Sequence, residues 1–357
     1  MPQTTKSVLV VDDSAFMRSL VTEIVEFRDD FRVVGTAANG VEALERVSSL
    51  APDIVTLDLA MPQMDGLAAL ERIMKEMPRP VIIVSAAESA NFNAAAVRAL
   101  ELGAVEFVRK PSGPVSVDLV AVRAELIRAL DTASMVRFGR CGREVKPQTT
   151  VGAQQPRLPM RGAGRVVVIA ASTGGPRALT EIVSGLPADL DAAVVVVQHM
   201  PPEFVPTLAD RLEQISAVRV TVAADGDALL AGHVYLSPGE GQMCLRRAHG
   251  AVEIEIDDNG RRLGARTTAD PLFQSAATIF GRRAVGVVLS GMGRDGAEGL
   301  RAIRGAGGGA IVQNRASSII YGMPAAALAT AGADRIAASD EIAAAIGWLL
   351  SPGRRVA

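Results

Sequence analysis

Hydrophobic and polar residues alternate in two different rhythms along the first third of the chain. Short β-branched runs predict strands, and apolar residues at helical spacing predict a helix after each one. Ser14 is placed to cap the first helix, and Asp65 directly precedes the third. One face of the second helix is expected to carry Val41, Leu44, Val47 and Leu50. The predicted strands are residues 8–11, 32–35, 54–57, 81–85 and 106–108. Five strands in strict alternation with five helices predict a doubly wound, five-stranded parallel sheet.

The pattern changes after a helix that begins near Val117 and runs towards Phe138. Gly, Pro, Arg and Lys then dominate up to residue 164, which predicts a linker. A solvated spacer is favoured there over a contact with an acidic surface. We therefore expect a first domain at residues 1–130, a linker at 131–164 and a larger domain at 165–357.

The larger domain is predicted to be α/β with a mostly parallel sheet, because strands and helices alternate again after residue 165. Turn sequences at residues 237–239 and 258–260 mark loops and a possible hairpin. The predicted strands are residues 166–170, 193–197, 234–236, 252–256, 285–289 and 310–312.

Composition excludes several functions. The 357 residues carry a formal charge of -2 and only 3% aromatic residues, so nucleic acid is not an expected partner. No apolar run approaches the roughly 20 residues that cross a bilayer, and the amino terminus lacks a signal-peptide pattern. A cytoplasmic protein without direct membrane insertion is expected. Cys141 and Cys244 form no C-x-x-C motif and are predicted to be free thiols.

Ionisable residues follow the predicted strands of the first domain. Asp12 and Asp13 end the first strand, Asp58 ends the third, Ser85 ends the fourth, and Lys110 follows the fifth. Because the carboxyl ends of parallel strands meet at one edge, an acidic pocket is expected there. Three carboxylates with open water positions suit Mg²⁺, and Asp58 is then free to take a phosphoryl group while Lys110 neutralises charge.

Residues 7 to about 130 resemble a response-regulator receiver domain. The resemblance rests on the sequences at residues 11–14, 58–66 and 110–111. It implies that a histidine kinase phosphorylates Asp58 and that Ser85 and Phe107 report the change. Ala60 stands where related proteins commonly carry Glu; its backbone carbonyl is still expected to bind the metal, with an altered phosphate lifetime.

In the second domain, Ser172 lies at a sharp strand-to-helix turn that resembles a nucleophile elbow, although a phosphate-cradling turn or a simple N-cap fits the same residues. A serine nucleophile needs a base, and the chain has three histidines. His199 follows a neighbouring strand and is placed to face Ser172. His233 enters a strand and His249 lies at a probable hairpin tip, so both are interpreted as structural or solvated.

The third element follows the strand at 285–289, where Asp295 is placed to orient the imidazole of His199. Residues 291–296 also spell G-x-G-x-x-G, but a dinucleotide loop is disfavoured because an aspartate inside the turn repels pyrophosphate and the next strand does not end in an acid. The Met292 amide is expected to donate to an oxyanion, with Thr173 as the second donor through its amide or hydroxyl.

Residues 165 to about 350 resemble the catalytic domain of the chemotaxis protein-glutamate methylesterases, on the sequences at 171–176, 198–202 and 291–296. The resemblance implies Ser172 as nucleophile, His199 as base, Asp295 as orienting acid and Met292 as oxyanion donor. It also implies hydrolysis of glutamate methyl esters on chemoreceptor cytoplasmic domains, releasing methanol, together with glutamine deamidation.

No cofactor is expected for ester hydrolysis, and the receiver is expected to cover the catalytic mouth until Asp58 is phosphorylated. Two alternatives stay open. In the first alternative, the second domain is a catalytically silent module that docks on receptors. In the second, the chain is a transcription regulator, which the lack of a basic recognition helix disfavours.

Overall fold

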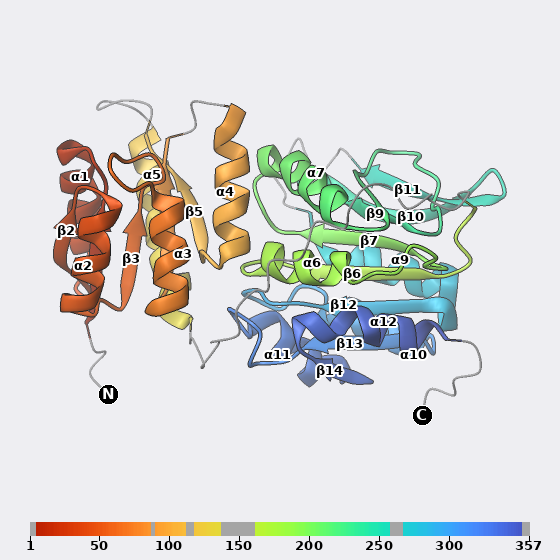
Figure 1. Cartoon of the computed structure of the whole chain (residues 1–357). Coiled ribbons are helices and arrows are strands. Elements are labelled where there is room, and N and C mark those ends of the chain that lie inside the picture. Colours follow the sequence, from red (N-terminus) through yellow and green to blue (C-terminus); the bar gives the residue numbers. More distant parts are fainter. Residues whose placement is uncertain (1–4, 87–89, 112–117, 137–160, 258–266, 352–357) are drawn as a thin grey trace. The chain divides into compact units, whose positions relative to one another are not determined.

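The computed structural model describes residues 5–86, 90–111, 118–136, 161–257 and 267–351 (Figure 1). The chain divides into two compact units, Met1–Glu144 and Val145–Ala357, each described separately below. The helix α5 ends at Met135, so helical structure extends into the stretch assigned to the linker. Cys141, the rest of the predicted linker and the turn at 258–260 lie outside the described residues.

The first unit contains the predicted five-stranded parallel sheet, in the order β2-β1-β3-β4-β5. This order is one of the common doubly wound arrangements, with helices on both faces of the sheet. The strands are β1 Lys6–Val11, β2 Phe31–Ala37, β3 Ile54–Leu57, β4 Val81–Ser85 and β5 Glu106–Arg109. The helices are α1 Ala15–Glu26, α2 Gly40–Leu50, α3 Gly66–Glu76, α4 Ala90–Leu102 and α5 Asp118–Met135.

Side-chain caps fix the starts of three of these helices. Ser14 and Asp65 accept hydrogen bonds from the first turns of α1 and α3, as the sequence predicts, and Asn39 does the same for α2. The predicted apolar face of α2 is only half correct. Leu44 and Val47 are buried, whereas Val41 and Leu50 are 40% and 36% exposed.

The second unit is built on a seven-stranded sheet in the order β14-β13-β12-β6-β7-β9-β8, in which every neighbouring pair is parallel. The central strands are β6 and β12, which lie side by side. The strand that follows β6 in the chain, β7, lies on one side of this pair, and the strand that follows β12, β13, lies on the other. The strand order therefore reverses between β6 and β12. The strands are β6 Val166–Ala171, β7 Ala193–Gln198, β8 Arg219–Val222, β9 His233–Leu236, β12 Ala284–Val288, β13 Gly309–Gln313 and β14 Arg335–Ala337. The strands β8 and β14 were not predicted.

Helices cover both faces of this sheet (Figure 1). On one face α9 and α10 pack on each other and on the central strands, with Val168, Phe273 and Leu300 in the core. On the other face α6 contacts α7 and α12. The helices are α6 Gly175–Ser184, α7 Val205–Ile215, α9 Ala269–Phe280, α10 Ala297–Gly305, α11 Gly322–Ala331 and α12 Ile342–Leu350.

A separate antiparallel hairpin pairs β10 Gln242–Ala248 with β11 Ala251–Asp257. His249 and Gly250 form its tip with φ of 52° and 81°, the left-handed pair that a tight hairpin turn requires. The predicted position of His249 at a hairpin tip is therefore confirmed. In the part of the chain that the structure describes, no helix has the length and apolar character needed to span a membrane.

Candidate functional sites

The carboxylates of the first unit meet at the carboxyl edge of its sheet, as predicted. Asp12 and Asp58 are buried after β1 and β3, and Lys110 Nζ lies 2.7 Å from a carboxylate oxygen of each. The Ser85 hydroxyl donates to the other Asp58 oxygen, Oδ1, at 2.7 Å. The Ala60 amide also faces Oδ1, at 3.4 Å. The Asp58 side chain is thus held by a cation, a hydroxyl and a main-chain amide.

Burial makes charge costly in this cluster. It raises the pKa of Asp12 above its ordinary value, although the hydrogen bond from Lys110 and the Ser14 amide act in the opposite direction. Burial also opposes the charge on Lys110, but hydrogen bonds to Asp12 and Asp58 outweigh it and raise the pKa of that amine. Two buried carboxylates, those of Asp12 and Asp58, therefore face a single cation, the Lys110 amine.

The donor set fits a hard divalent cation. One carboxylate oxygen from each of Asp12, Asp13 and Asp58 lies within 4.8 Å of the others, and Asp13 is exposed so that water can complete the coordination. Phe107, the predicted aromatic reporter, is buried and packs edge-on against Phe92 of α4, with ring centroids 5.3 Å apart.

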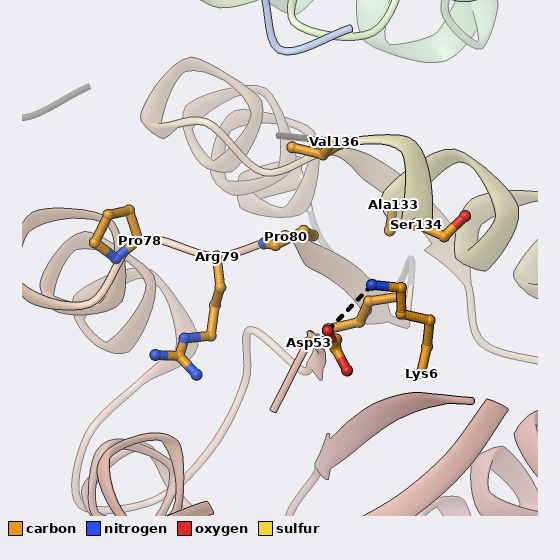
Figure 2. Close-up of a pocket in the computed structure, with 9 residues that line it drawn as sticks. Lys6, Asp53, Pro78, Arg79, Pro80, Ala133, Ser134 and Val136 are labelled. Atoms are coloured by element: carbon orange, nitrogen blue, oxygen red, sulfur yellow. Dashed lines mark hydrogen bonds and ion pairs between the residues drawn. The ribbon is translucent and has the colours of Figure 1, made fainter. Parts of the chain in front are cut away.

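A pocket lies at the opposite edge of this sheet, where the strands begin (Figure 2). Lys6 and Asp53 line it and form an ion pair at 3.2 Å. The Arg79 guanidinium is bound to the carbonyls of Pro52 and Met77, both at 3.0 Å. The charged side chains of this pocket, Lys6, Asp53 and Arg79, are thus bound to other groups of the protein. The pocket is separate from the acidic cluster of Asp12, Asp13 and Asp58.

In the second unit, Ser172 directly follows β6 at the carboxyl edge of the sheet. Gly174 has φ of 82° and begins α6 without a side-chain cap, so Ser172 does not cap the helix. Close contacts leave no room for larger residues near the serine: a Cβ at Gly291 would lie 2.7 Å from Ser172 Cβ. The strand-to-helix turn is as sharp as the sequence indicates.

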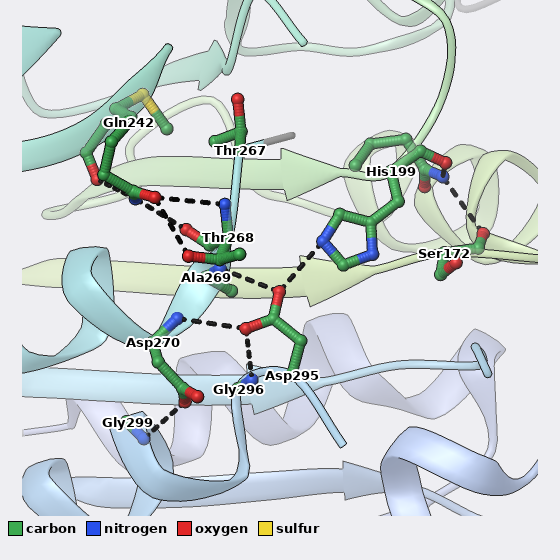
Figure 3. A network of polar contacts seen from close by, with 12 residues as sticks. Ser172, His199, Gln242, Thr267, Thr268, Ala269, Asp270, Asp295, Gly296 and Gly299 are labelled. Carbon is green, nitrogen blue, oxygen red and sulfur yellow. Dashed lines mark hydrogen bonds and ion pairs between the residues drawn. The ribbon is translucent and has the colours of Figure 1, made fainter. Parts of the chain in front are cut away.

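His199 lies between Ser172 and Asp295 (Figure 3). Its Nε2 is 2.9 Å from Asp295 Oδ2, and the two side chains are only 22% and 17% exposed. Because Nε2 donates to the carboxylate, Nδ1 is the ring nitrogen that remains to accept a proton. Among the described residues the Ser172 hydroxyl makes no hydrogen bond; catalytic hydrogen bonds are often long before substrate binds.

Four donors saturate the carboxylate of Asp295. Besides His199, the amides of Ala269, Asp270 and Gly296 donate to it at 2.8, 3.3 and 3.0 Å. The first two are the opening N–H groups of α9, so the positive end of a helix faces the carboxylate. Burial alone would raise the pKa of Asp295, but the hydrogen bonds from His199 and the two α9 amides lower it below its ordinary value.

Ser290 is fully buried and joins two turns by hydrogen bonds: the glycine-rich turn after β12, residues 291–296, and the serine turn after β6, residues 172–174. The Ser172 amide donates to the Ser290 carbonyl at 3.0 Å, and Ser290 Oγ donates to the Thr173 carbonyl at 2.7 Å. Gly291 donates to the Ile320 carbonyl at 3.0 Å, which anchors the turn from the other side. The segments that carry Thr173 and Met292, the two predicted oxyanion donors, are therefore neighbours.

The remaining histidines lie apart from this site. His233 Nε2 lies 2.9 Å from Thr221 Oγ1, and its ring stacks on Tyr235 at 4.0 Å. His249 is 89% exposed and pairs with Glu253 at 3.3 Å. Cys244 is a free thiol, and burial raises its pKa, so it stays protonated at neutral pH. The two histidines thus have the structural or solvated character that the sequence predicts, and Cys244 is the free thiol that it predicts.

Three supporting features have no counterpart in the sequence-based prediction: the start of α9, Ser290 and Gln198. Gln198 Nε2 donates to the carbonyls of Ser172 and His199, both at 3.0 Å. The only available signal was position, since Gln198 and Ser290 are polar residues that end or follow otherwise apolar strands. The dinucleotide alternative is also disfavoured by geometry, because the Asp295 carboxylate lies within the turn and already takes the Gly296 amide at the start of α10, where a phosphate would bind.

The two units together define a class of protein: a phosphoacceptor-like α/β module joined to an α/β unit with the framework of a serine hydrolase. Family models agree with this class. The CheB methylesterase model matches residues 167–346, and the response regulator receiver domain model matches residues 8–120. The chain belongs to the CheB methylesterase family and carries an N-terminal receiver domain.

Two relatives that match most of both chains support this membership. A protein-glutamate methylesterase/protein-glutamine glutaminase of Geobacillus kaustophilus is 41% identical over 97% of this chain and 99% of its own. One of the same name from Pyrococcus horikoshii is 42% identical over 94% of this chain and 91% of its own. The CheB methylesterase catalytic domain of Thermotoga maritima, a crystal structure, is 34% identical over 53% of this chain and 98% of its own, with a TM-score of 0.48.

Proposed function

We propose that the protein hydrolyses glutamate methyl esters on chemoreceptor cytoplasmic domains, releasing methanol, and deamidates glutamine by the same chemistry. The observation that carries the proposal is the 2.9 Å contact between His199 and Asp295 beside Ser172, at the carboxyl edge where the strand order reverses. Curated relatives that match 94% or more of this chain are named for both activities. We also propose a cytoplasmic location, because the proposed substrates are cytoplasmic domains of receptors.

In the proposed mechanism, His199 Nδ1 takes the hydroxyl proton as Ser172 Oγ attacks the side-chain carbonyl carbon. The carbonyl oxygen becomes an oxyanion that the N–H groups of Thr173 and Met292 stabilise. The same proton then passes to the departing methoxide, which leaves as methanol and yields a glutamyl-serine ester. Water, activated by His199, hydrolyses this ester and restores Ser172. Asp295 holds the imidazole in the required tautomer and stabilises its charged form.

The receiver is proposed to regulate this reaction. A histidine kinase donates a phosphoryl group to Asp58, with Ser85 and Lys110 binding the phosphoryl oxygens and Phe107 reporting the change. Asp12, Asp13, Asp58 and the Ala60 carbonyl would hold Mg²⁺, which supplies neutralisation of phosphoryl charge when bound. The geometry of the cluster supports this assignment, because one carboxylate oxygen from each of the three aspartates lies within 4.8 Å of the others and a single lysine faces Asp12 and Asp58.

The test is methanol release from a methylated receptor cytoplasmic fragment, with and without a small-molecule phosphodonor and Mg²⁺. Loss of the nucleophile in Ser172→Ala should lower the rate by about 10⁴-fold or more. Release that the donor raises and Ser172→Ala abolishes supports both parts of the proposal. Release that ignores the donor rejects receiver control, and no release from the folded, phosphorylated protein rejects the esterase in favour of a receptor-docking module.

A further inference from the structure

The side-chain amide of Gln198 connects the main chain at Ser172 to the main chain at His199. The residue is the last of β7, directly precedes His199 and is 4% exposed. Its Nε2 donates to two main-chain carbonyls, those of Ser172 and His199. The opposite amide orientation would set Oε1 against both carbonyls, so this pair of contacts fixes which end of the amide is the donor.

The other end of the same amide is unsatisfied. Gln198 Oε1 is buried and accepts no hydrogen bond from any described residue. A buried acceptor without a donor disfavours folding and calls for an explanation at each site where it occurs. A methionine or leucine would fill the same space without that cost. The donor contacts of Nε2 are therefore the feature for which this side chain is suited.

The Ser172 carbonyl belongs to the peptide unit whose N–H is that of Thr173. A trans peptide is planar, and its C=O and N–H point in opposite directions. Gln198 Nε2 at 3.0 Å and the Gly175 amide at 2.7 Å hold the carbonyl on one side. The Thr173 N–H must then point away from both groups. It donates to no partner among the described residues, so it is available to a ligand.

The peptides before and after this unit are also fixed. The Ser172 amide donates to the Ser290 carbonyl, and the Thr173 carbonyl accepts from Ser290 Oγ. Ser290 thus holds the two flanking peptides, while Gln198 and Gly175 hold the central one. A rotation of the central peptide is the movement that would turn the Thr173 N–H away from an oxyanion.

We propose that Gln198 is a positioning residue that aims the Thr173 N–H as the second oxyanion donor, by holding the carbonyl of the 172–173 peptide. The proposal deepens the proposed esterase function and rests on it. It also explains the second glycine of the turn. A Cβ at Gly175 would lie 1.9 Å from Gln198 Oε1, so only glycine lets the amide pack against this turn.

The test compares Gln198→Met with the unaltered full-length protein in methanol release under phosphodonor and Mg²⁺. Methionine preserves the shape of the side chain and removes the donor. Loss of a whole oxyanion donor costs about 10²–10³ in kcat, and the Gly175 amide still holds the carbonyl, so a loss of about tenfold in kcat is expected. KM should change by less than about twofold, because the oxyanion exists only beyond the ground state.

Two inhibitors separate positioning from general damage. In a peptide trifluoromethyl ketone, Ser172 Oγ bonds to the ketone carbon, the hydroxyl proton passes to His199, and the ketone oxygen becomes the oxyanion. Gln198→Met should weaken its binding by the same factor of about ten as kcat, since both losses arise at one donor. The second inhibitor is the same peptide with an ether in place of the ketone, so it has no carbonyl oxygen. Its binding should not change in Gln198→Met. The acid limb of the pH–rate profile should keep its position. Gln274→Met, on the exposed face of α9, is the matched control and should behave like the unaltered protein.

Several results would overturn the inference. Unchanged kcat and unchanged ketone affinity in folded Gln198→Met would show that the Thr173 N–H needs no help from Gln198. Equal weakening of ketone and ether, or a displaced acid limb with unchanged ketone affinity, would assign Gln198 to substrate binding or to His199 instead. Methanol release by Ser172→Ala at the full rate would overturn the proposed function as well, which distinguishes the two failures.

Discussion

Replacement of Asp295 by asparagine tests the tautomer argument with almost no change in shape. Both carboxylate oxygens are acceptors: Oδ2 binds His199 and the Ala269 amide, and Oδ1 binds the Asp270 and Gly296 amides. An asparagine must place its NH₂ group at one of these positions. At Oδ1 it would face two N–H donors with no way to satisfy them.

At the Oδ2 position the NH₂ group meets one amide and one imidazole nitrogen. The imidazole can adapt by becoming the acceptor at Nε2, which moves its proton to Nδ1. His199 would then present N–H rather than a lone pair towards Ser172, and it could not take the hydroxyl proton. The corresponding change in serine proteases lowers kcat about 10⁴-fold, equal to about 5 kcal/mol of transition-state stabilisation.

We expect Asp295→Asn to lower kcat for methanol release by about that factor, with KM nearly unchanged. Asp334→Asn is the matched control. Asp334 is also a nearly buried carboxylate that accepts a main-chain amide, from Ala310 at 2.8 Å, and it lies by β13 and away from Ser172. It should lose some stability and keep its kcat. A fall of less than about tenfold in folded Asp295→Asn would refute the tautomer argument.

Three further predictions follow from the described contacts. Asp58→Asn should abolish activation by phosphodonor and leave basal release intact; persistent activation would exclude Asp58 as acceptor. Gly174→Ala should destabilise the second unit by about 1 kcal/mol or more in urea titrations, because φ is 82° and the new Cβ meets Ser290 Oγ at 2.8 Å. Burial raises the pKa of Tyr235 from 10.0 to about 12, so its hydroxyl contributes stability that is complete below pH 10.0 and lost towards pH 12. Tyr235→Phe should remove that part of the alkaline loss, and an unchanged profile would contradict it.

The sequence predicted the strands best where both faces are buried. Ile54–Leu57 and Val81–Ser85 have the predicted bounds because each is a continuous apolar run that ends at polar or turn residues. Arg219–Val222 and Arg335–Ala337 escaped prediction because they are the two edge strands of their sheet. Their outer faces are exposed, and their sequences therefore mix charged and apolar residues.

In the candidate site, the residues that follow strands could be predicted from the sequence, whereas those that act through residues far away in the chain could not. Ser172, His199 and Asp295 each follow a strand, and the rule that strand ends share an edge is enough to bring them together. Two of the four donors to Asp295 come from the start of α9, well before that aspartate in the chain, and no motif near Ala269 predicts this contact. The proposed role of Gln198 could not be predicted either, since it depends on the carbonyl of Ser172, which follows another strand.

The strand order of the second unit constrains when its site comes into being. The middle strand β6 pairs with β7 soon after it in the chain, but its other neighbour, β12, follows more than a hundred residues later. Such a high contact order delays closure of the sheet, and no nascent chain shorter than Asp295 can hold the complete site. The first unit, whose five strands are consecutive, can fold during synthesis before β12 has been made. Under the proposed function, the cluster around Asp58 would therefore fold before the site of Ser172, His199 and Asp295 is complete.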